Sequence, residues 1–373
     1  MPTPILQFGT SRFLQAHVDL FVDEALARGE ALGRITVVQT TTSAQSRRRL
    51  AAFNAPGGYP VRIRGRRDGV TVDEEHRVNA IAAALHAGED WAAVCDAAAM
   101  AQVIVSNTGD RGYELDREDG PHLHGAAVAP RSFPAKLLVL LRERFRRGGA
   151  PVTLYPCELV ANNGSVLRDT VLGLAQAWQL DDALVAYLRT GCIWINSLVD
   201  RIVSAPIEPA GAIAEPYALW VMERQPRMVL PCRHPSIVVT DRLEPFERRK
   251  LFLLNLGHTW LAECWLAAQR APDDTVAAAL ADPARRSELE ALWEEEVLPV
   301  FAAPGEADAA RAYLVQVRDR FANPFLAHRL ADIAQNHGEK KRRRLLPVVE
   351  LAGRLGLDLR QPRLHAALAS GAV

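Results

Sequence analysis

Short, fully apolar segments in the first half of the chain are separated by amphipathic helical patterns. The segment Ile5–Phe8 ends at Gly9, and from Phe13 to Ala25 apolar side chains then recur every three or four residues, as in a half-buried helix. Similar apolar segments occupy residues 35–39, 103–107 and 151–155. Continuously apolar strands that alternate with helices are typical of a parallel sheet covered on both faces. The first half therefore predicts a doubly wound α/β domain.

The pattern changes after about residue 240. From residue 244 onward helical spacing dominates, β-branched residues are sparse, and prolines break the sequence into segments. A length of 373 residues suits two domains. We expect the fold to be α/β, with a Rossmann-type dinucleotide-binding domain over residues 1–235, followed by a mostly α-helical substrate and catalytic domain over residues 236–373.

The charge balance and the cysteines exclude several classes of function. Lys plus Arg equals Asp plus Glu at 44 each, which gives no indication of nucleic acid or an anionic membrane as a partner. No stretch is apolar enough for a membrane span, and the first residues do not resemble a cleavable leader, so we expect a cytoplasmic protein. The five cysteines are scattered and form no zinc-ligand spacing, so we expect no metal.

The first strand leads into a turn that suits a dinucleotide. A strand, a glycine turn and a helix N-terminus bring main-chain N–H groups close to a pyrophosphate. The predicted cofactor-binding residues here are Phe8, Gly9, Thr10, Ser11, Arg12 and Phe13. Only the first glycine of the usual G-x-G-x-x-G pattern is present, and the pattern alone is weak.

The end of the second strand bears on the choice between NAD and NADP. Gln39 stands where an acid favours NAD, and three arginines follow at residues 47–49. We therefore add Gln39 to the cofactor-binding residues. The local chemistry leaves NADP open, although the arginines also fit a solvated helix face.

Lys250, Asn255 and His258 lie in a segment that combines an apolar pattern with three chemically useful side chains. In an α-helix they fall within an arc of about 140°. Oxidation of a secondary alcohol needs a base for the hydroxyl proton and donors for the developing oxyanion. A lysine can be that base without a metal, while an amide and an imidazole hold the oxygen. The alternative is that Lys250 extends along the surface and the other two are hydrogen-bonded core residues.

Asn196 gives a second amide in apolar surroundings, followed by the acid–base pair Asp200-Arg201. Farther along, the basic run at residues 340–344 is expected to form a solvated helix face, with a phosphate or partner site as the alternative. An anionic substrate would need a cation, and the candidates are Arg201, Arg329 and this run.

With these segments in view, the chain resembles the long-chain mannitol dehydrogenase family of polyol and uronate oxidoreductases, and within it the tagaturonate (altronate) reductase branch. The resemblance covers most of the length in five ordered segments. They are Ile5-Leu6-Gln7-Phe8-Gly9 with Arg12-Phe13-Leu14, Ser106-Asn107-Thr108, Pro156-Cys157-Glu158-Leu159 with Asn163-Gly164, Asn196 to Val203 together with Lys250 to His258, and Asn323-Pro324-Phe325 with His328 and Asp332-Ile333.

The resemblance implies a role for each matching residue. Lys250 would be the general base, Asn196 and Asn255 would stabilise the oxyanion, and His258 would bind the substrate hydroxyl. Ser106, Asn107 and Thr108 would bind the cofactor, while Glu158, Asn163 and Arg201 are candidate substrate-binding residues. The family works without a metal and mostly with NAD. The opening turn departs from it in having Thr10-Ser11 where a second glycine is usual.

We therefore expect an NAD(P)-dependent dehydrogenase that acts on the CH–OH group of a small sugar acid, in the manner of tagaturonate or fructuronate reductase. The alternative within the class is a mannitol-type polyol or sugar-phosphate dehydrogenase, since the chain is closer in length to the mannitol-1-phosphate enzymes. A non-catalytic nucleotide-binding protein is a third reading, but binding alone would not require Lys250, Asn255, His258 and Asn196 together. The expected assembly is a monomer or a homodimer.

Overall fold

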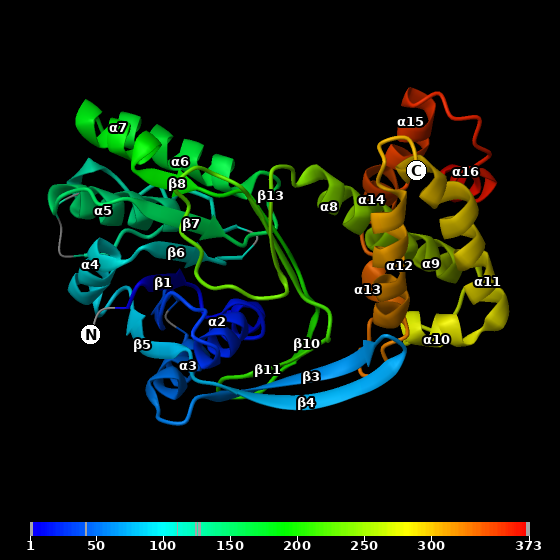
Figure 1. The fold of residues 1–373 in the computed structure, drawn as a ribbon, viewed down its shortest axis with the longest axis horizontal. Helices are drawn as coiled ribbons and strands as arrows, with labels where there is room; N and C mark the ends of the chain where they lie inside the picture. Colours follow the sequence, from blue (N-terminus) through cyan, green and yellow to red (C-terminus); the bar gives the residue numbers. More distant parts are fainter. Residues whose placement is uncertain (1–2, 42, 110, 124, 126–127, 371–373) are drawn as a thin grey trace. The chain divides into compact units, whose positions relative to one another are not determined.

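The computed structural model describes residues 3–41, 43–109, 111–123, 125 and 128–370. Contacts divide the chain into two compact units (Figure 1). The first, here called the Rossmann unit, comprises residues 1–63, 74–214 and 218–243. The second, the helical unit, comprises residues 64–73, 215–217 and 244–373.

A six-stranded sheet forms the centre of the Rossmann unit. Its order is β5-β2-β1-β6-β7-β8, and every neighbouring pair is parallel. The strands are β1 (Ile5–Phe8), β2 (Ile35–Gln39), β5 (Ile81–His86), β6 (Val103–Ser106), β7 (Val152–Pro156) and β8 (Cys192–Trp194). The predicted segments at 5–8 and 35–39 match β1 and β2. The segment at 103–107 ends one residue beyond β6, and the segment at 151–155 is shifted by one residue from β7 at both ends. The doubly wound α/β prediction is confirmed.

Helices connect these strands and bury apolar faces against the sheet. The connecting helices are α1 (Arg12–Gln15), α2 (Val18–Ala27), α3 (Ala44–Asn54), α4 (Trp91–Met100), α5 (Phe133–Arg146), α6 (Asn163–Ala177) and α7 (Asp182–Thr190), with a 3-10 turn η1 (Pro121–Leu123). The single helix expected after Gly9 is split into α1 and α2 at His17, whose φ and ψ of −127° and −89° are not helical. One continuous core joins β1, β6 and β7 to α4, α5, α6 and α7.

Two smaller sheets were not predicted. One has the order β10-β11-β3-β4 and the other β13-β12-β9. Their strands are β3 (Tyr59–Arg67), β4 (Val70–Val78), β9 (Ser197–Asp200), β10 (Val203–Pro206), β11 (Ala212–Ala214), β12 (Leu219–Glu223) and β13 (Ile237–Thr240). The proline-rich stretch at 206–235 contains β11 and β12. Their pairing with β3 and β9 is long-range, and single-segment patterns do not reveal such pairing.

The helical unit follows the expectation for the second half of the chain. Its elements are α8 (Glu244–Arg249), η2 (Lys250–Asn255), α9 (Leu256–Ala267), α10 (Val276–Ala281), α11 (Pro283–Ala291), η3 (Leu292–Val297), η4 (Leu298–Phe301), α12 (Ala307–Phe321), α13 (Leu330–Ile333), α14 (His337–Arg344), α15 (Leu346–Arg354) and α16 (Pro362–Ala369). Both η2 and η3 are π-helical, whereas η4 is 3-10. A core that includes Leu253, Leu256, Trp293 and Phe321 joins the helices.

A buried ion pair holds the short segment 215–217 to α12 within the helical unit. Arg320 binds Glu215 through two bonds, Nε to Oε2 at 3.0 Å and Nη2 to Oε1 at 2.8 Å, and each side chain is only 2% exposed. The Arg320 guanidinium also lies 4.4 Å from the centre of the Tyr217 ring. Among the described residues, no helix is both long enough and apolar enough to cross a membrane.

Candidate functional site

The order of the central sheet places Gly9 at the topological switch point. The strand order extends in one direction from β1 through β2 and β5, and in the other from β6 through β7 and β8. Gly9 follows β1 with a φ of +111°, and a Cβ atom at this position would lie 2.4 Å from the carbonyl oxygen of Asn107, just after β6. This turn therefore requires glycine. It allows a ligand to approach the main chain, as pyrophosphate does in doubly wound folds.

Side chains on both sides fix this turn. The Ser11 hydroxyl donates to Asn107 Oδ1 at 2.9 Å and accepts from the Leu14 N–H at 3.1 Å, which caps α1. Arg49 donates from Nη1 to the Thr10 carbonyl at 3.1 Å. Arg12 forms an ion pair with Glu208 at 2.6 Å. Hydrogen bonds with distant residues thus hold the turn, although it lacks the second glycine.

The remaining predicted cofactor-binding residues near the turn are largely engaged in packing. Phe8 is fully buried and lies 5.4 Å from Phe133, ring centre to ring centre. Phe13 stacks on the His17 ring at 4.6 Å. Phe8 and Phe13 therefore support the turn by packing against other side chains of the protein.

Gln39 ends β2 at the position where dinucleotide-binding domains read the ribose. Its Nε2 atom donates to the Thr41 carbonyl at 2.8 Å, while its Oε1 atom is buried and has no partner in the described part of the chain. An unpartnered acceptor is suited to a ribose hydroxyl donor. Together with the glycine cradle, it fits a nicotinamide dinucleotide.

Glu158 and Asn163, both predicted to bind substrate, have their polar atoms engaged within the Rossmann unit. Glu158 accepts hydrogen bonds from Ser106, the last residue of β6, and from Thr108, which follows this strand. The Asn163 amide donates to the carbonyls of Pro156 at 3.0 Å, Glu158 at 3.2 Å and Ser197 at 2.9 Å. These bonds join the ends of β6 and β7 to the start of β9.

Asn196 and Arg201 lie at the two ends of β9. Asn196 Oδ1 accepts from the Ser165 N–H at 2.9 Å, and Nδ2 donates to Glu223 Oε2 at 2.8 Å. Its amide is therefore held in a fixed orientation by α6 and β12. Arg201 donates from Nη1 to the carbonyl of Ala16 at 2.6 Å.

The other three predicted catalytic residues, Lys250, Asn255 and His258, lie in the helical unit. The α-helix expected over this segment is instead a π-helical turn, η2, that continues into α9. The Leu256 N–H bonds to the carbonyl of Leu251 five residues earlier. A π-turn brings residues five apart onto one side, so Lys250 and Asn255 share a face. Such turns are frequent at functional sites.

His258 lies in an aromatic cluster. It is 7% exposed, stacks on Phe321 at 4.3 Å and meets the His328 ring edge-on at 4.7 Å. Burial, together with the charges of Arg320, Lys340 and Arg344, lowers the pKa of His328, whereas Asp332 acts in the opposite direction. The neutral form of this imidazole is therefore favoured. His328 entered the sequence interpretation only through resemblance, without a role, because helical spacing from α9 does not reach it.

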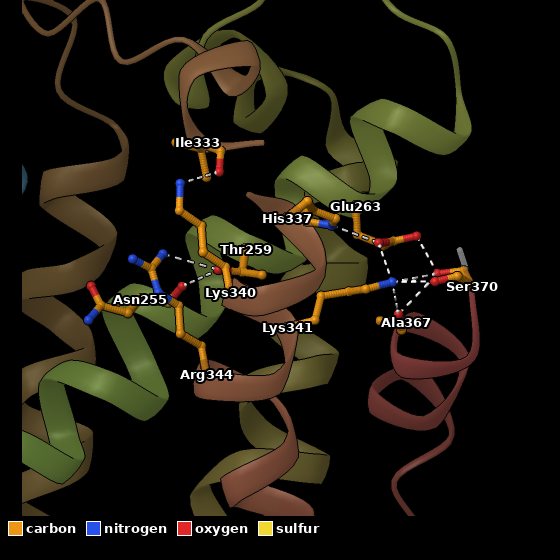
Figure 2. A network of polar contacts seen from close by, with 10 residues as sticks. All are labelled: Asn255, Thr259, Glu263, Ile333, His337, Lys340, Lys341, Arg344, Ala367 and Ser370. Carbon is orange, nitrogen blue, oxygen red and sulfur yellow. Dashed lines mark hydrogen bonds and ion pairs between the residues drawn. The ribbon is translucent and has the colours of Figure 1, made fainter. Parts of the chain in front are cut away.

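The basic run divides between two sides of α14. Figure 2 shows Arg344 pointing toward Asn255 and Thr259 and the Lys340 amine reaching the Ile333 carbonyl, whereas Lys341 points toward Glu263 and Ser370. Arg344 Nη1 donates to Thr259 Oγ1 at 3.2 Å, and Thr259 donates to the Asn255 carbonyl at 3.0 Å. Arg344 is thereby linked to the main chain of a predicted catalytic residue.

The expectation that this run is a solvated helix face is wrong at Lys341. Its side chain is buried, pairs with Glu263 at 3.1 Å and donates to the Ala367 carbonyl at 2.8 Å, which joins α14 to α9 and α16. Residues 340 and 344 are four apart and share a helix face, whereas residue 341 lies about 100° around the helix from residue 340.

Comparison with known proteins identifies the family. Residues 3–230 match the mannitol dehydrogenase Rossmann domain, and residues 242–372 match the mannitol dehydrogenase C-terminal domain. The chain belongs to the mannitol dehydrogenase family. It is therefore a dehydrogenase, and the resemblance seen in the sequence is confirmed.

Several relatives in this family carry one activity in their names. An altronate oxidoreductase of Halalkalibacterium halodurans is 32% identical over 371 residues, which is 93% of this chain and 70% of the relative. An altronate oxidoreductase of Bacillus subtilis is 30% identical over 94% of this chain and 75% of the relative. These relatives support the altronate branch of the mannitol dehydrogenase family.

Solved structures of the family share the fold. A substrate-free D-sorbitol dehydrogenase superposes with a TM-score of 0.80 at 22% identity, covering 95% of this chain and 77% of the other. The mannitol 2-dehydrogenase of Pseudomonas fluorescens, in a ternary complex with NAD and D-mannitol, gives 0.71 at 20% identity, with 98% and 78% covered. At these identities the likeness establishes the fold.

Gly9→Ala is expected to weaken dinucleotide binding by at least about tenfold, equivalent to about 1.4 kcal/mol. The new Cβ atom would crowd the Asn107 carbonyl, and alanine disfavours the positive φ of this turn. Calorimetric titration with NAD measures the change. Gly29→Ala is the matched control, because φ there is +69° and open space surrounds the position. Equal binding by both variants would remove Gly9 from the cofactor site.

Proposed function

We propose that this protein oxidises a secondary alcohol of a small sugar acid to a ketone, and catalyses the reverse reduction, with NAD as the cofactor and without a metal. The altronate–tagaturonate pair is the substrate class that we favour. The observation that carries the proposal is the shared face of Lys250 and Asn255 on a π-turn, in a chain whose central sheet holds a glycine cradle for a dinucleotide. The altronate oxidoreductases among its relatives support the substrate class.

The catalytic roles follow from the chemistry of each side chain. The nicotinamide, when bound, exchanges a hydride with the carbon that bears the hydroxyl. Lys250 takes the hydroxyl proton at its Nζ atom and returns it in the reverse direction. Asn255 donates an N–H group to the substrate oxygen as negative charge develops there, a role that the family resemblance also gives to Asn196. His258, held against Phe321, donates to or accepts from a substrate hydroxyl.

Two cations of α14 favour an anionic substrate over an uncharged polyol. Lys340 and Arg344 lie on one helix face, and no carboxylate pairs with either in the part of the chain that the structure describes. Burial and the Arg344 charge lower the pKa of Lys340, and burial and the Arg343 charge lower the pKa of Arg344. A carboxylate would relieve this repulsion and accept charge-assisted bonds. Arg329 stays a weaker candidate because its side chain is exposed. Arg201 stays a weaker candidate because its Nη1 atom already donates to the Ala16 carbonyl.

We propose NAD as the cofactor. NADP is tested as well, because Gln39 stands where an acid would favour NAD. The mannitol 2-dehydrogenase neighbour was solved with NAD, which supports a nicotinamide cofactor. Metal independence rests on the capacity of lysine to act as the base. In the described ranges, no three His, Cys, Asp or Glu side chains gather in a way that could hold a metal ion.

A substrate panel tests the proposed function. Purified protein is mixed with NAD or NADP and an aldonate, a polyol or a sugar phosphate, and reduced cofactor is followed by its absorbance. We expect altronate or a related aldonate to give a kcat/KM at least about tenfold above that of mannitol or sorbitol, since one charge-assisted contact is worth this much. Turnover of sugar phosphates or polyols in preference to aldonates would instead establish the alternative in which the enzyme is a polyol or sugar-phosphate dehydrogenase.

A further inference from the structure

Glu158 holds together two loops at one edge of the central sheet. Glu158 follows β7, and the residue is only 3% exposed. Oε1 accepts from the N–H of Thr108 at 3.0 Å and from the Thr108 hydroxyl at 2.9 Å. Oε2 accepts from the hydroxyls of Ser106 and Tyr113, each at 3.1 Å. Four donors therefore converge on one buried carboxylate, which occupies its acceptor positions.

The loop that Glu158 holds forms one side of the glycine turn. Asn107 lies between the two residues anchored by Glu158, and its carbonyl oxygen is the atom that a Cβ on Gly9 would meet. Asn107 Oδ1 accepts from Ser11, and Asn107 Nδ2 donates to the Cys157 carbonyl at 2.8 Å. A displacement of this loop would therefore move the main chain opposite Gly9.

We propose that Glu158 is a positioning residue for the nicotinamide half of the cofactor, and that it acts through the loop 106–108 rather than by contact with the substrate. In doubly wound folds each half of the sheet binds one mononucleotide. By this rule β1, β2 and β5 belong to the half that would bind the adenine nucleotide, while β6, β7 and β8 form the other half. Glu158 joins the ends of β6 and β7, which places its influence on the nicotinamide half.

The protonation states of the neighbours agree with this role. Burial and the Glu158 charge raise the pKa of Tyr113, so its hydroxyl stays a donor to the carboxylate. Burial and the same charge raise the pKa of Cys157, so its thiol stays neutral beside the loop. Tyr113 and Cys157 are thus neutral neighbours of Glu158 in this described cluster.

Glu158→Gln is the variant that tests the inference. The amide keeps the volume but replaces one acceptor oxygen by an NH₂ group, which then faces two donors. Calorimetry is performed with NAD and, separately, with AMP, which occupies only the adenine half. We expect the Kd of NAD to rise by about tenfold, the effect of one unsatisfied buried group, while the Kd of AMP stays within about twofold. A general loss of structure would instead weaken both ligands alike.

Tyr113→Phe and Thr108→Val provide independent variants if Glu158→Gln does not fold. Each removes one hydroxyl that donates to the carboxylate, and each should weaken NAD more than AMP. Combined with Glu158→Gln, their effects should be less than additive, because all three act on one hydrogen-bonded unit. Additive effects would mean that the residues act separately, and would contradict the inference.

Three further results would overturn the inference. They are an unchanged NAD affinity in all three variants, an equal loss for NAD and AMP, or a raised KM for the sugar acid with NAD affinity intact. The last would restore Glu158 as a substrate contact. The inference rests on the nicotinamide cofactor of the proposed function, and the two fail differently. If the unaltered protein binds neither NAD nor NADP, the proposed function fails, whereas binding that the variants leave unchanged refutes only the role of Glu158.

Discussion

Lys250→Ala is expected to lower kcat by about three orders of magnitude, within the range that general-base catalysis contributes. The alanine variant has no group at this position to take the hydroxyl proton. The glycine turn proposed to hold the dinucleotide is unaltered, so the Kd of NAD should stay within about twofold. Steady-state kinetics give kcat and KM, and calorimetry gives the Kd. A proportionate fall of kcat and kcat/KM indicates an interaction made in the transition state.

Lys250→Arg separates charge from proton transfer. Arginine keeps the positive charge but stays protonated in proteins, so it cannot serve as the base. It should be nearly as slow as the alanine variant. If Lys250→Arg kept near-normal turnover at neutral pH, Lys250 would act as a fixed charge and the assigned base would be wrong.

Arg320→Ala is expected to reduce the free energy of unfolding by about 3–5 kcal/mol, the cost of leaving a buried charge without its partner. Glu215 would keep a carboxylate in surroundings where it is 2% exposed, and both guanidinium hydrogen bonds would be lost. The segment 215–217 is held to α12 by this pair, so its loss also releases Tyr217 from the guanidinium. Urea denaturation followed by circular dichroism measures the change.

Arg311→Ala is the matched control on the same helix. Arg311 pairs with Glu294 at 3.0 Å, but the two side chains are 60% and 42% exposed. An exposed pair of this kind contributes about 1 kcal/mol or less. If Arg320→Ala lowers the free energy of unfolding by no more than Arg311→Ala does, then burial does not increase the contribution of the Arg320–Glu215 pair to stability.

The sequence predicted those parts of the fold that depend on local pattern. The bounds of β1 and β2 were predicted because each is a mostly apolar run with clear ends, Gly9 in the first case and a cluster of hydroxyl side chains in the second. The hairpin β3–β4 was missed because it is rich in charge, with arginines at alternate positions from 62 to 66 that turn away from the buried face. Its pairing with β11, about 150 residues later, is set by tertiary contacts.

The candidate site was only partly predictable. Lys250, Asn255 and His258 could be grouped by helical spacing, and the structure keeps them on consecutive turns of η2 and α9. The π-turn itself has no sequence signature, and the His328 contact comes from a separate segment. Glu158 could be noticed as a buried acid after a strand, but its four donors come from a loop about 50 residues earlier.

The most direct test of the central claim is NAD reduction by altronate after exhaustive dialysis of the protein against a chelator. We predict that absorbance of the reduced cofactor rises at the same rate before and after dialysis, because in the proposed mechanism Lys250 rather than a metal-bound water takes the proton. Activity that disappears on dialysis and returns with a divalent cation would contradict the lysine mechanism. An absence of turnover with altronate and every other aldonate, with NAD still bound, would contradict the assignment of a sugar-acid substrate.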